Sequence, residues 1–421
     1  LVRSRGLGDV YKRQSFMTLL VFGTASTVSA QEFDVAAKHA IAVEATTGKI
    51  LYEKDANQPV EIASITKLVT VYLVYEALEQ GTISLSTPVD ISDYPYKLTT
   101  NSEASNVPME ARNYTVEQLL EATMVSSANS AAIALAEKIA GSEKDFVDKM
   151  RAKLLEWGIQ DATIVNTTGL NNETLGDNIY PGSKKDDENK LSAYDVSIVA
   201  RNLIRDYPQV LEITKKPTST FAGLEIHSTN YMLEGMPAYR GGIDGLKTGT
   251  TDKAGASFVG TTVEKGMRII TVVLNADQQD TNPYARFTAT SALLDYISAN
   301  FALKTVVQKG EAYNDSKVTV LDGKEDNVTA VAKSDISIVQ RIGSGTTPAL
   351  QFTPKSTSEM APLKEGKVVG TLTYDDQDLI GQGYLTSDKP SFEMVSEKKV
   401  EKAFFLKVWW NQFIRFINEK L

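Results

Sequence analysis

The sequence predicts an α/β (α+β) body, in which an antiparallel sheet is flanked by helices, followed by a small all-β domain and a terminal amphipathic helix. Three observations carry this prediction. Helix and strand patterns are mixed from about residue 39 to residue 302. Short β-rich runs separated by turn residues fill residues 304–393. Apolar side chains then recur at steps of three and four through residues 400–421.

Local signals place the elements of the body. Residues 39–43 and 50–52 flank the turn Thr46-Thr47-Gly48-Lys49, and residues 256–263 and 268–276 flank Glu264-Lys265-Gly266, so both pairs predict β-hairpins. Apolar residues at helical spacing, with Gly81 and Gly141 as stop signals, predict further helices. The expected helices cover residues 64–79, residues 116–123, an alanine-rich segment that ends at residue 140, and residues 285–301.

The amino terminus predicts export. Residues 16–28 are apolar, Lys12 and Arg13 precede them, and Val28-Ser29-Ala30 has the small residues of a cleavage site. The apolar run is too short to span a membrane. We therefore expect a signal peptide over residues 1–30, although residues 1–14 do not match the usual start of a leader. The mature chain then begins near Gln31 and works outside the cytoplasm.

The carboxyl terminus predicts a membrane anchor. One side of the helix expected over residues 400–421 carries Leu406, Trp410, Phe413, Ile417 and Leu421, and the opposite side carries Lys407, Asn411, Arg415 and Asn418. Such a helix lies in a membrane interface with its tryptophans at headgroup level. Lys407 and Arg415 interrupt it too often for a membrane span. The alternative is a helix that packs on the protein itself.

Composition excludes several classes of function. The net charge of −9 over 421 residues argues against nucleic acid as a partner. The chain has no cysteine, and its only histidines are His39 and His227. Thiol catalysis and cysteine-based zinc sites are therefore excluded, and neither a metal nor another cofactor is expected. A Ser-His-Asp triad would have to use one of these two histidines, so we expect the base of a hydrolase to be another residue type. The charged run 184–188 is expected to be a solvated loop.

The first chemical motif is Ser64-Ile65-Thr66-Lys67. Positions i and i+3 share one face of a helix, so Lys67 can reach the Ser64 hydroxyl. The expected helix start at Ser64 and the nearby Lys247 would lower the pKa of Lys67 and favour its neutral, basic form. The motif alone has little specificity, because Ser396–Lys399 is a second copy.

Two shorter motifs follow. Ser127-Ala128-Asn129 lies between two expected helices, where a hydroxyl can relay a proton and an amide can hold a peptide bond, although helix capping explains such residues equally well. Lys247-Thr248-Gly249 precedes the second hairpin. Its lysine and hydroxyl can hold a carboxylate, and its glycine would leave room for a substrate along the strand.

The order and joint presence of these motifs resemble the penicillin-binding proteins and serine β-lactamases. The nearer resemblance is to the low-molecular-mass D-alanyl-D-alanine carboxypeptidases. This resemblance covers most of residues 35–300. The segments that carry it are AVEATTGKILYEKDANQPVEIASITKLVT, MVSSANSAAIALAEKIAG, NTTGL and GIDGLKTGTTDKAGASFVGT. The resemblance implies a serine β-lactamase/DD-peptidase-like catalytic domain over residues 31–303. A β-sandwich stalk over residues 304–394 and an anchoring helix over residues 395–421 would complete the chain.

The resemblance also implies roles for individual residues. Ser64 would attack the carbonyl of the penultimate D-alanine, Lys67 would take its proton, and Ser127 would pass a proton to the leaving D-alanine. The residues implied in substrate binding are Asn129, Lys247, Thr248, Gly249 and Thr250, with the backbone N–H groups of Ser64 and Thr250 forming an oxyanion hole. Water would then hydrolyse the acyl-enzyme.

The implied partners are the D-Ala-D-Ala end of a peptidoglycan stem pentapeptide, β-lactam antibiotics as covalent inhibitors, and the outer surface of the bacterial cytoplasmic membrane. Three alternatives stay open at this point. A serine β-lactamase of class A would use a glutamate in an E-x-x-L-N setting, and residues 188–192 lack that asparagine. A non-enzymatic wall sensor would carry a dead site. A transpeptidase would pass the acyl group to an amine.

Overall fold

The computed structural model describes residues 33–102, 104–345, 347–386 and 389–420. The signal peptide expected over residues 1–30 and the terminal Leu421 lie outside these residues. The described residues from Val35 onward form one compact unit.

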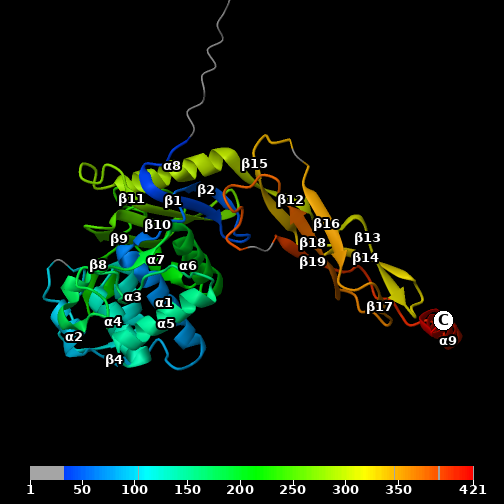
Figure 1. Cartoon of the computed structure of the whole chain (residues 1–421), viewed down its shortest axis with the longest axis horizontal. Coiled ribbons are helices and arrows are strands. Elements are labelled where there is room, and N and C mark those ends of the chain that lie inside the picture. Colours follow the sequence, from blue (N-terminus) through cyan, green and yellow to red (C-terminus); the bar gives the residue numbers. More distant parts are fainter. Residues whose placement is uncertain (1–32, 103, 346, 387–388, 421) are drawn as a thin grey trace, which may run out of the picture. The chain divides into compact units, whose positions relative to one another are not determined.

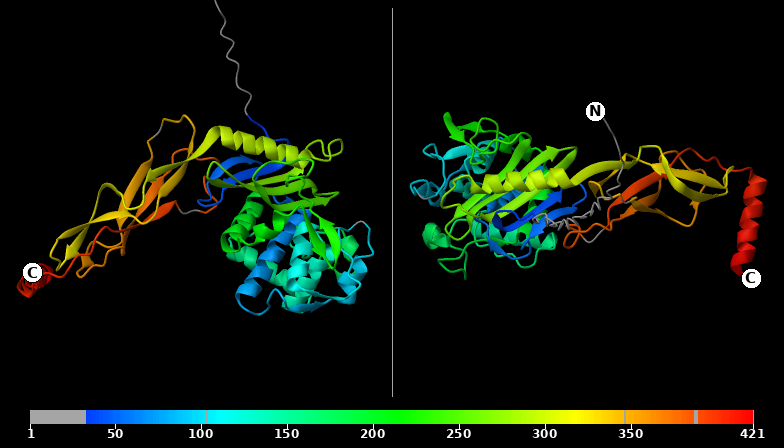
Figure 2. Two further views of the ribbon diagram at one scale, coloured as in Figure 1. Left: turned by 180° about the vertical axis from the view of Figure 1, so that it is seen from behind. Right: turned by 90° about the horizontal axis from the view of Figure 1, so that it is seen from above.

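An antiparallel five-stranded sheet forms the centre of the body, with the strand order β2-β1-β11-β10-β9. Its strands are β1 (Ala37–Glu44), β2 (Ile50–Lys54), β9 (Ile243–Thr251), β10 (Gly255–Glu264) and β11 (Met267–Ala276). Both predicted hairpins are present, because β1 pairs with β2 and β10 pairs with β11. Helix α8 (Ala285–Asn300) covers one face of this sheet, and the other helices of the body lie on the opposite face (Figures 1 and 2).

The opposite face carries a helical cluster. Its members are α1 (Lys67–Glu79), α2 (Asp93–Leu98), α3 (Val116–Val125), α4 (Asn129–Ala140), α5 (Glu143–Glu156), α6 (Ala193–Asp206) and α7 (Val210–Thr214). Two 3-10 segments are η1 (Ala63–Thr66) and η2 (Asn172–Asn178). Three small strand pairs complete the body: β3 (Val60–Glu61) with β6 (Lys190–Leu191), β4 (Pro88–Asp90) with β5 (Asn113–Thr115), and β7 (Thr218–Phe221) with β8 (Leu224–His227).

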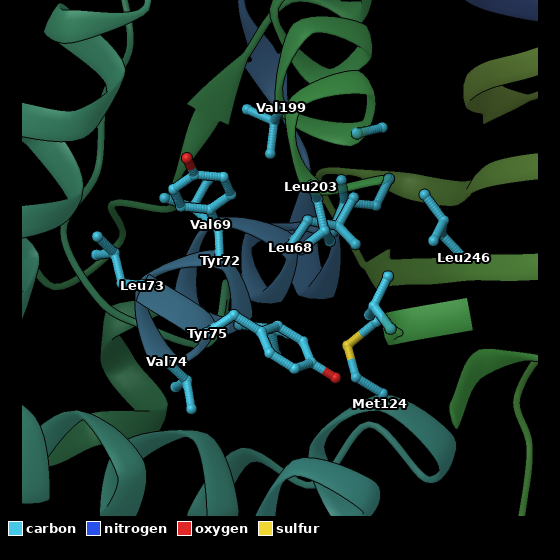
Figure 3. Packing of buried hydrophobic residues seen from close by; sticks show 14 of the residues in the cluster. Leu68, Val69, Tyr72, Leu73, Val74, Tyr75, Met124, Val199, Leu203 and Leu246 are labelled. Carbon is cyan, nitrogen blue, oxygen red and sulfur yellow. The ribbon is translucent and has the colours of Figure 1, made fainter. Parts of the chain in front are cut away.

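Helix α1 runs through the core of the body. Its side chains from Leu68 to Tyr75 are buried, and they pack with Met124 of α3, with Val199 and Leu203 of α6, and with Leu246 of β9 (Figure 3). Each fully buried side chain of this kind stabilises the fold by about 1.5–3 kcal/mol. The helix is apolar all round, as expected of a buried helix. The core therefore fixes the helix that begins directly after the Ser64 turn.

The remaining chain forms the predicted all-β domain. Its strands are β12 (Phe301–Val307), β13 (Ala312–Leu321), β14 (Asn327–Ala332), β15 (Ile336–Arg341), β16 (Ala349–Pro354), β17 (Glu359–Met360), β18 (Val368–Asp375) and β19 (Ser391–Ser396). They make a two-stranded sheet, β12-β15, and a six-stranded sheet, β16-β18-β19-β14-β13-β17, that share one apolar core. Helix α9 (Phe405–Lys420) ends the described chain. The predicted fold class is confirmed.

Candidate active site

Ser64 lies in a 3-10 turn rather than at the start of the predicted α-helix. The turn η1 covers Ala63–Thr66 and runs directly into α1, and Ala63 holds a positive φ of 47° at its start. A 3-10 turn has three residues per turn, so side chains three apart eclipse each other. The turn therefore aligns the Ser64 side chain with that of Lys67 more closely than the predicted α-helix would.

Lys67 is completely buried and its amino group has three partners. Its Nζ lies 2.8 Å from Ser64 Oγ, 2.7 Å from Asn129 Oδ1 and 3.0 Å from the carbonyl oxygen of Thr168. A neutral amine has two N–H donors and one lone pair. The amide and carbonyl oxygens can accept those two donors, which leaves the lone pair for the Ser64 hydroxyl proton.

Burial lowers the pKa of Lys67 well below its ordinary value, and the charge of Lys247 lowers this pKa further. The effect of Lys247 was predicted, whereas the burial is visible only in the structure. Lys247 is itself completely buried, and burial followed by the charge of Arg286 lowers the pKa of Lys247 to about 7. Burial also lowers the pKa of Arg286 to about 10. Burial therefore disfavours the charged forms of all three basic side chains, and a bound anion would favour them again.

The second motif lies in the connection between α3 and α4. Ser127 is 4% exposed, has a positive φ of 60°, and lines the same cavity as Ser64. Asn129 begins α4, and its amide is engaged at both ends, because Oδ1 faces Lys67 and Nδ2 donates to the carbonyl oxygen of Ser105 at 2.8 Å. The bond to Ser105 uses one of the two N–H donors of the Asn129 amide, so the second donor can serve a substrate.

The third motif lies on β9, at the edge of the sheet. Lys247 Nζ donates to the carbonyl oxygen of Thr248 at 3.0 Å, and the Thr248 hydroxyl lies 2.6 Å from that of Thr229. Gly249 was predicted to leave room for a substrate along the strand. The structure gives a different reason, since a Cβ at Gly249 would lie 2.6 Å from the carbonyl oxygen of Ile62. Glycine at this position lets β9 approach the Ser64 turn.

These elements enclose a cavity of about 200 Å³ that is lined mainly by hydroxyl groups and one cation. Its polar side chains come from Ser64, Ser105, Ser127, Thr229, Thr248, Thr250 and Arg286, with Tyr231 and Phe287 beside them. Arg286 extends from the first turn of α8, where its Nη1 donates to the carbonyl oxygens of Gly249 at 2.9 Å and Ser257 at 3.1 Å. A cavity with one cation and several hydroxyls fits a ligand that carries a carboxylate.

The residues that shape the loop next to Lys67 were not predicted from the sequence. Asn166 Oδ1 accepts hydrogen bonds from the backbone N–H of Thr168 and of Gly169, which shapes the loop whose Thr168 carbonyl faces Lys67. Buried Glu143 accepts from the N–H and the hydroxyl of Thr167 in the same loop. The segment NTTGL had been noted without a role. Nothing local in the sequence linked Glu143 to it.

The described residues that line the cavity include no carboxylate. Glu188, the nearest sequence match to a deacylating glutamate, is buried and not solvated as predicted. It accepts hydrogen bonds from Thr251 Oγ1 at 2.6 Å and from Asn171 Nδ2 at 3.1 Å. Within the described residues, no group of three or more His, Asp or Glu side chains is placed to hold a metal ion.

Known protein families match both parts of the chain. Residues 24–278 match the family described as D-alanyl-D-alanine carboxypeptidase, and residues 301–402 match the C-terminal domain of penicillin-binding protein 5. A D-alanyl-D-alanine carboxypeptidase of Bacillus subtilis, DacF, is 28% identical over 386 residues, which cover 90% of each chain.

The chain is also similar to solved structures of penicillin-binding proteins. The crystal structure of a peptidoglycan synthesis regulatory factor, penicillin-binding protein 3 of Streptococcus pneumoniae, is 80% identical with a TM-score of 0.86 and covers 88% of this chain and 100% of its own. Penicillin-binding protein D2 of Listeria monocytogenes, solved in ampicillin-bound form, is 30% identical with a TM-score of 0.53 and covers 63% of this chain and 98% of its own.

Proposed function

The chain belongs to the serine-type D-alanyl-D-alanine carboxypeptidases, a family of low-molecular-mass penicillin-binding proteins, and we propose that its acyl-enzyme forms on Ser64. The observation that carries this proposal is the 2.8 Å approach of Lys67 Nζ to Ser64 Oγ inside a buried, lowered-pKa environment. The substrate in this proposal is a peptidoglycan stem pentapeptide that ends in D-Ala-D-Ala.

Acylation follows from these positions. Ser64 Oγ attacks the carbonyl carbon of the penultimate D-alanine while its proton moves to Lys67 Nζ. The backbone N–H groups of Ser64 and Thr250 stabilise the oxyanion, a contribution of about 3–4 kcal/mol for one donor in other enzymes. The C–N bond then breaks, and a proton passes through Ser127 to the leaving D-alanine nitrogen.

The leaving D-alanine carries the carboxylate that the cavity suits. Thr248 and Arg286 form the cationic and hydroxyl-rich side of the cavity, and the buried Lys247 Nζ lies 3.0 Å from the carbonyl oxygen of Thr248. A bound carboxylate there would raise the pKa of Lys247 and restore its charge. Water then attacks the ester on Ser64, which releases the shortened peptide and returns the proton to the serine. We place water rather than an amine as acceptor because the family is that of the carboxypeptidases.

Penicillin labelling tests this assignment. A β-lactam carries a reactive amide carbonyl next to a carboxylate, and we expect it to acylate Ser64 in the same way. The intact mass of the wild type should rise by the mass of benzylpenicillin, with the adduct on the Ser64 peptide, and Ser64→Ala should show no adduct. Lys67→Met should acylate about 10²–10⁴ times more slowly. An adduct on Ser127 or on another residue would contradict the assignment.

Deacylation separates this function from that of a β-lactamase. The Glu188 carboxylate accepts hydrogen bonds from Thr251 and Asn171, so we do not expect it to activate water for deacylation. The penicilloyl-enzyme should therefore persist after excess penicillin is removed. Rapid loss of the adduct with turnover of penicillin would favour the β-lactamase. Failure of a folded wild type to bind penicillin at all would favour the sensor.

We further propose that α9 holds the enzyme at the outer face of the cytoplasmic membrane, with the β domain as a stalk. Phe405, Trp409, Trp410 and Phe416 are each more than half exposed, and aromatic side chains of this kind favour a membrane interface. No helix among the described residues is long and apolar enough to cross a bilayer. Removal of residues 400–421 should release the protein from liposomes, and continued sedimentation with liposomes would contradict the anchor.

A further inference from the structure

The polar side of α9 faces the β domain. Val408 is 8% exposed, and Asn411 and Arg415 are half-buried, whereas Trp409 is 61% exposed and Phe416 is 61% exposed. Positions 408, 411 and 415 form one stripe of a helix because they are three and four residues apart. The helix therefore lies with this stripe against the protein and with its aromatic side chains outward.

Acidic residues of the turn between β13 and β14 hold Arg415 of this stripe and the neighbouring Lys407. Arg415 Nη2 lies 3.0 Å from both carboxylate oxygens of Asp322, whose side chain is only 1% exposed. Lys407 Nζ lies 3.1 Å from Asp326 Oδ1 and 3.3 Å from the carbonyl oxygen of Gly323. A buried carboxylate is costly without a partner, so the Asp322–Arg415 pair strongly favours this one orientation of the helix.

The charges around the helix nearly cancel. Residues 397–420 carry six basic and three acidic side chains, and the turn 322–326 adds three acidic side chains and one basic one. Further pairs join the two segments, since Lys398 contacts Glu325 at 2.5 Å and Lys324 contacts Glu401 at 2.5 Å. Little positive charge is therefore left to attract an anionic surface.

From this we infer that Asp322 and Asp326 neutralise and orient α9, so that the helix takes uncharged and zwitterionic lipid surfaces as readily as anionic ones. The inference rests on the proposed membrane anchor and adds the lipid class to it. Binding then comes from burial of the aromatic and aliphatic side chains, which does not depend on headgroup charge. Lys407 and Arg415 then pair with carboxylates of the β domain instead of with lipid phosphates.

The expected effect of freeing these cations is measurable. One lysine or arginine near an anionic surface strengthens binding by about fivefold. If Asp322 and Asp326 hold Arg415 and Lys407, removal of both acids should raise the preference for anionic lipid by about 25-fold. Asparagine is a suitable replacement at Asp322, where φ is +58°, because asparagine tolerates a positive φ.

The test is a flotation assay of the mature full-length chain. Vesicles of phosphatidylcholine alone are compared with vesicles that also contain phosphatidylglycerol, at low and high salt. The variants are Asp322→Asn and Asp322→Asn/Asp326→Asn. Asp315→Asn is the matched control, because it removes one acid from an exposed position of β13 in the same domain. Thermal unfolding confirms that each variant is folded.

For the wild type and for Asp315→Asn, we expect the affinities for the two kinds of vesicle to agree within about threefold and to change little with salt. The Asp322 variants should gain a salt-sensitive preference for vesicles that contain phosphatidylglycerol. A wild type that prefers anionic vesicles tenfold or more would overturn the inference and leave the anchor standing. Unchanged preference in folded Asp322 variants would also overturn it. Binding of the wild type to neither vesicle would remove the anchor and the inference together.

Discussion

At the scale of single residues, the proposed mechanism gives two buried lysines different tasks. Lys67 must be neutral to accept the proton of Ser64, and its pKa lies well below the ordinary value because of burial and Lys247. Lys247 must be charged to hold a carboxylate, and its pKa of about 7 makes that charge depend on pH. In the proposed mechanism, acid conditions would protonate Lys67, and alkaline conditions would remove the charge of Lys247.

The first prediction concerns this pH dependence. Above pH 7 the free enzyme progressively loses the proton of Lys247, so kcat/KM for a D-Ala-D-Ala peptide should fall with rising pH through that range. Lys247→Arg keeps a cation throughout and should remove the fall, at a lower plateau. The measurement is kcat/KM across pH 5–10 with both proteins. An alkaline fall at the same pH in Lys247→Arg would assign it to another group.

At the scale of elements, the loop 166–169 and the turn η1 fix each other. Gly169 has a positive φ of 81°, and a Cβ there would lie 1.8 Å from the carbonyl oxygen of Ala63, the residue before Ser64. The loop thus presses against the turn that carries Ser64, while its Thr168 carbonyl oxygen lies 3.0 Å from Lys67 Nζ. A shift of about 1 Å in such an arrangement costs about 10²-fold in rate.

The second prediction separates this contact from backbone strain. Gly158 also has a φ of 81°, but a Cβ there would meet nothing within 4 Å. Ala at either position costs about 1–2 kcal/mol of stability through the left-handed backbone, whereas only Gly169→Ala displaces the Ser64 turn. We expect penicillin acylation to slow at least about 100-fold in Gly169→Ala and to stay near the wild-type rate in Gly158→Ala. Equal rates in the two variants would contradict the contact.

The third prediction concerns the support of this loop by α5. Glu143 accepts from Thr167 and also from the hydroxyl of Tyr94 at 2.7 Å. Glu143→Ala leaves the buried Thr167 groups without this acceptor, which costs about 1–3 kcal/mol, and should slow acylation. Glu143→Gln keeps an acceptor for Thr167 and should restore most of the rate. Stopped-flow acylation beside thermal unfolding gives both quantities, and a stability loss without a change in acylation would mean that Glu143 is purely structural.

The sequence predicted those elements whose signals are local. Both sheet hairpins, the helix after Ser64 and the β domain followed from periodicity and turns. Helix α6 was missed, although Ser192 and Asp195 form a capping box at its start. Arg286 and Glu143 were missed for a different reason, since each reaches the site across a long sequence distance. The burial of Lys67, Lys247 and Glu188 depends on such packing and has no local signature.

At the scale of the whole described chain, one buried ion pair joins the first hairpin to the β domain. Lys49 Nζ lies 2.6 Å from Asp376 Oδ2, and the two side chains are 1% and 2% exposed. Lys49 also donates to the carbonyl oxygen of Val339, and the hydroxyl of Tyr384 donates to Asp376 at 2.7 Å. Nearby Leu385 packs into the core of the body. The start of β2, which follows Lys49, is therefore linked to the β domain by buried contacts.

The fourth prediction follows from this pair. Asp376→Ala leaves the Lys49 charge buried without its carboxylate, which should lower the free energy of unfolding by about 3–5 kcal/mol. The exposed pair Lys333–Glu393 provides the comparison, and Glu393→Ala should cost about 0–1 kcal/mol. Urea unfolding of the two variants measures the difference. Similar losses in both would show that the Lys49–Asp376 contact contributes no more than a surface pair.

We propose that Ser64, activated by Lys67, releases D-alanine from a stem peptide. The most direct measurement is D-alanine release from a soluble pentapeptide ending in D-Ala-D-Ala, compared between the wild type and Ser64→Ala at equal folded concentration. We expect steady release by the wild type and none above background by Ser64→Ala. Release at the wild-type rate by Ser64→Ala, or no release by a folded wild type, would contradict it.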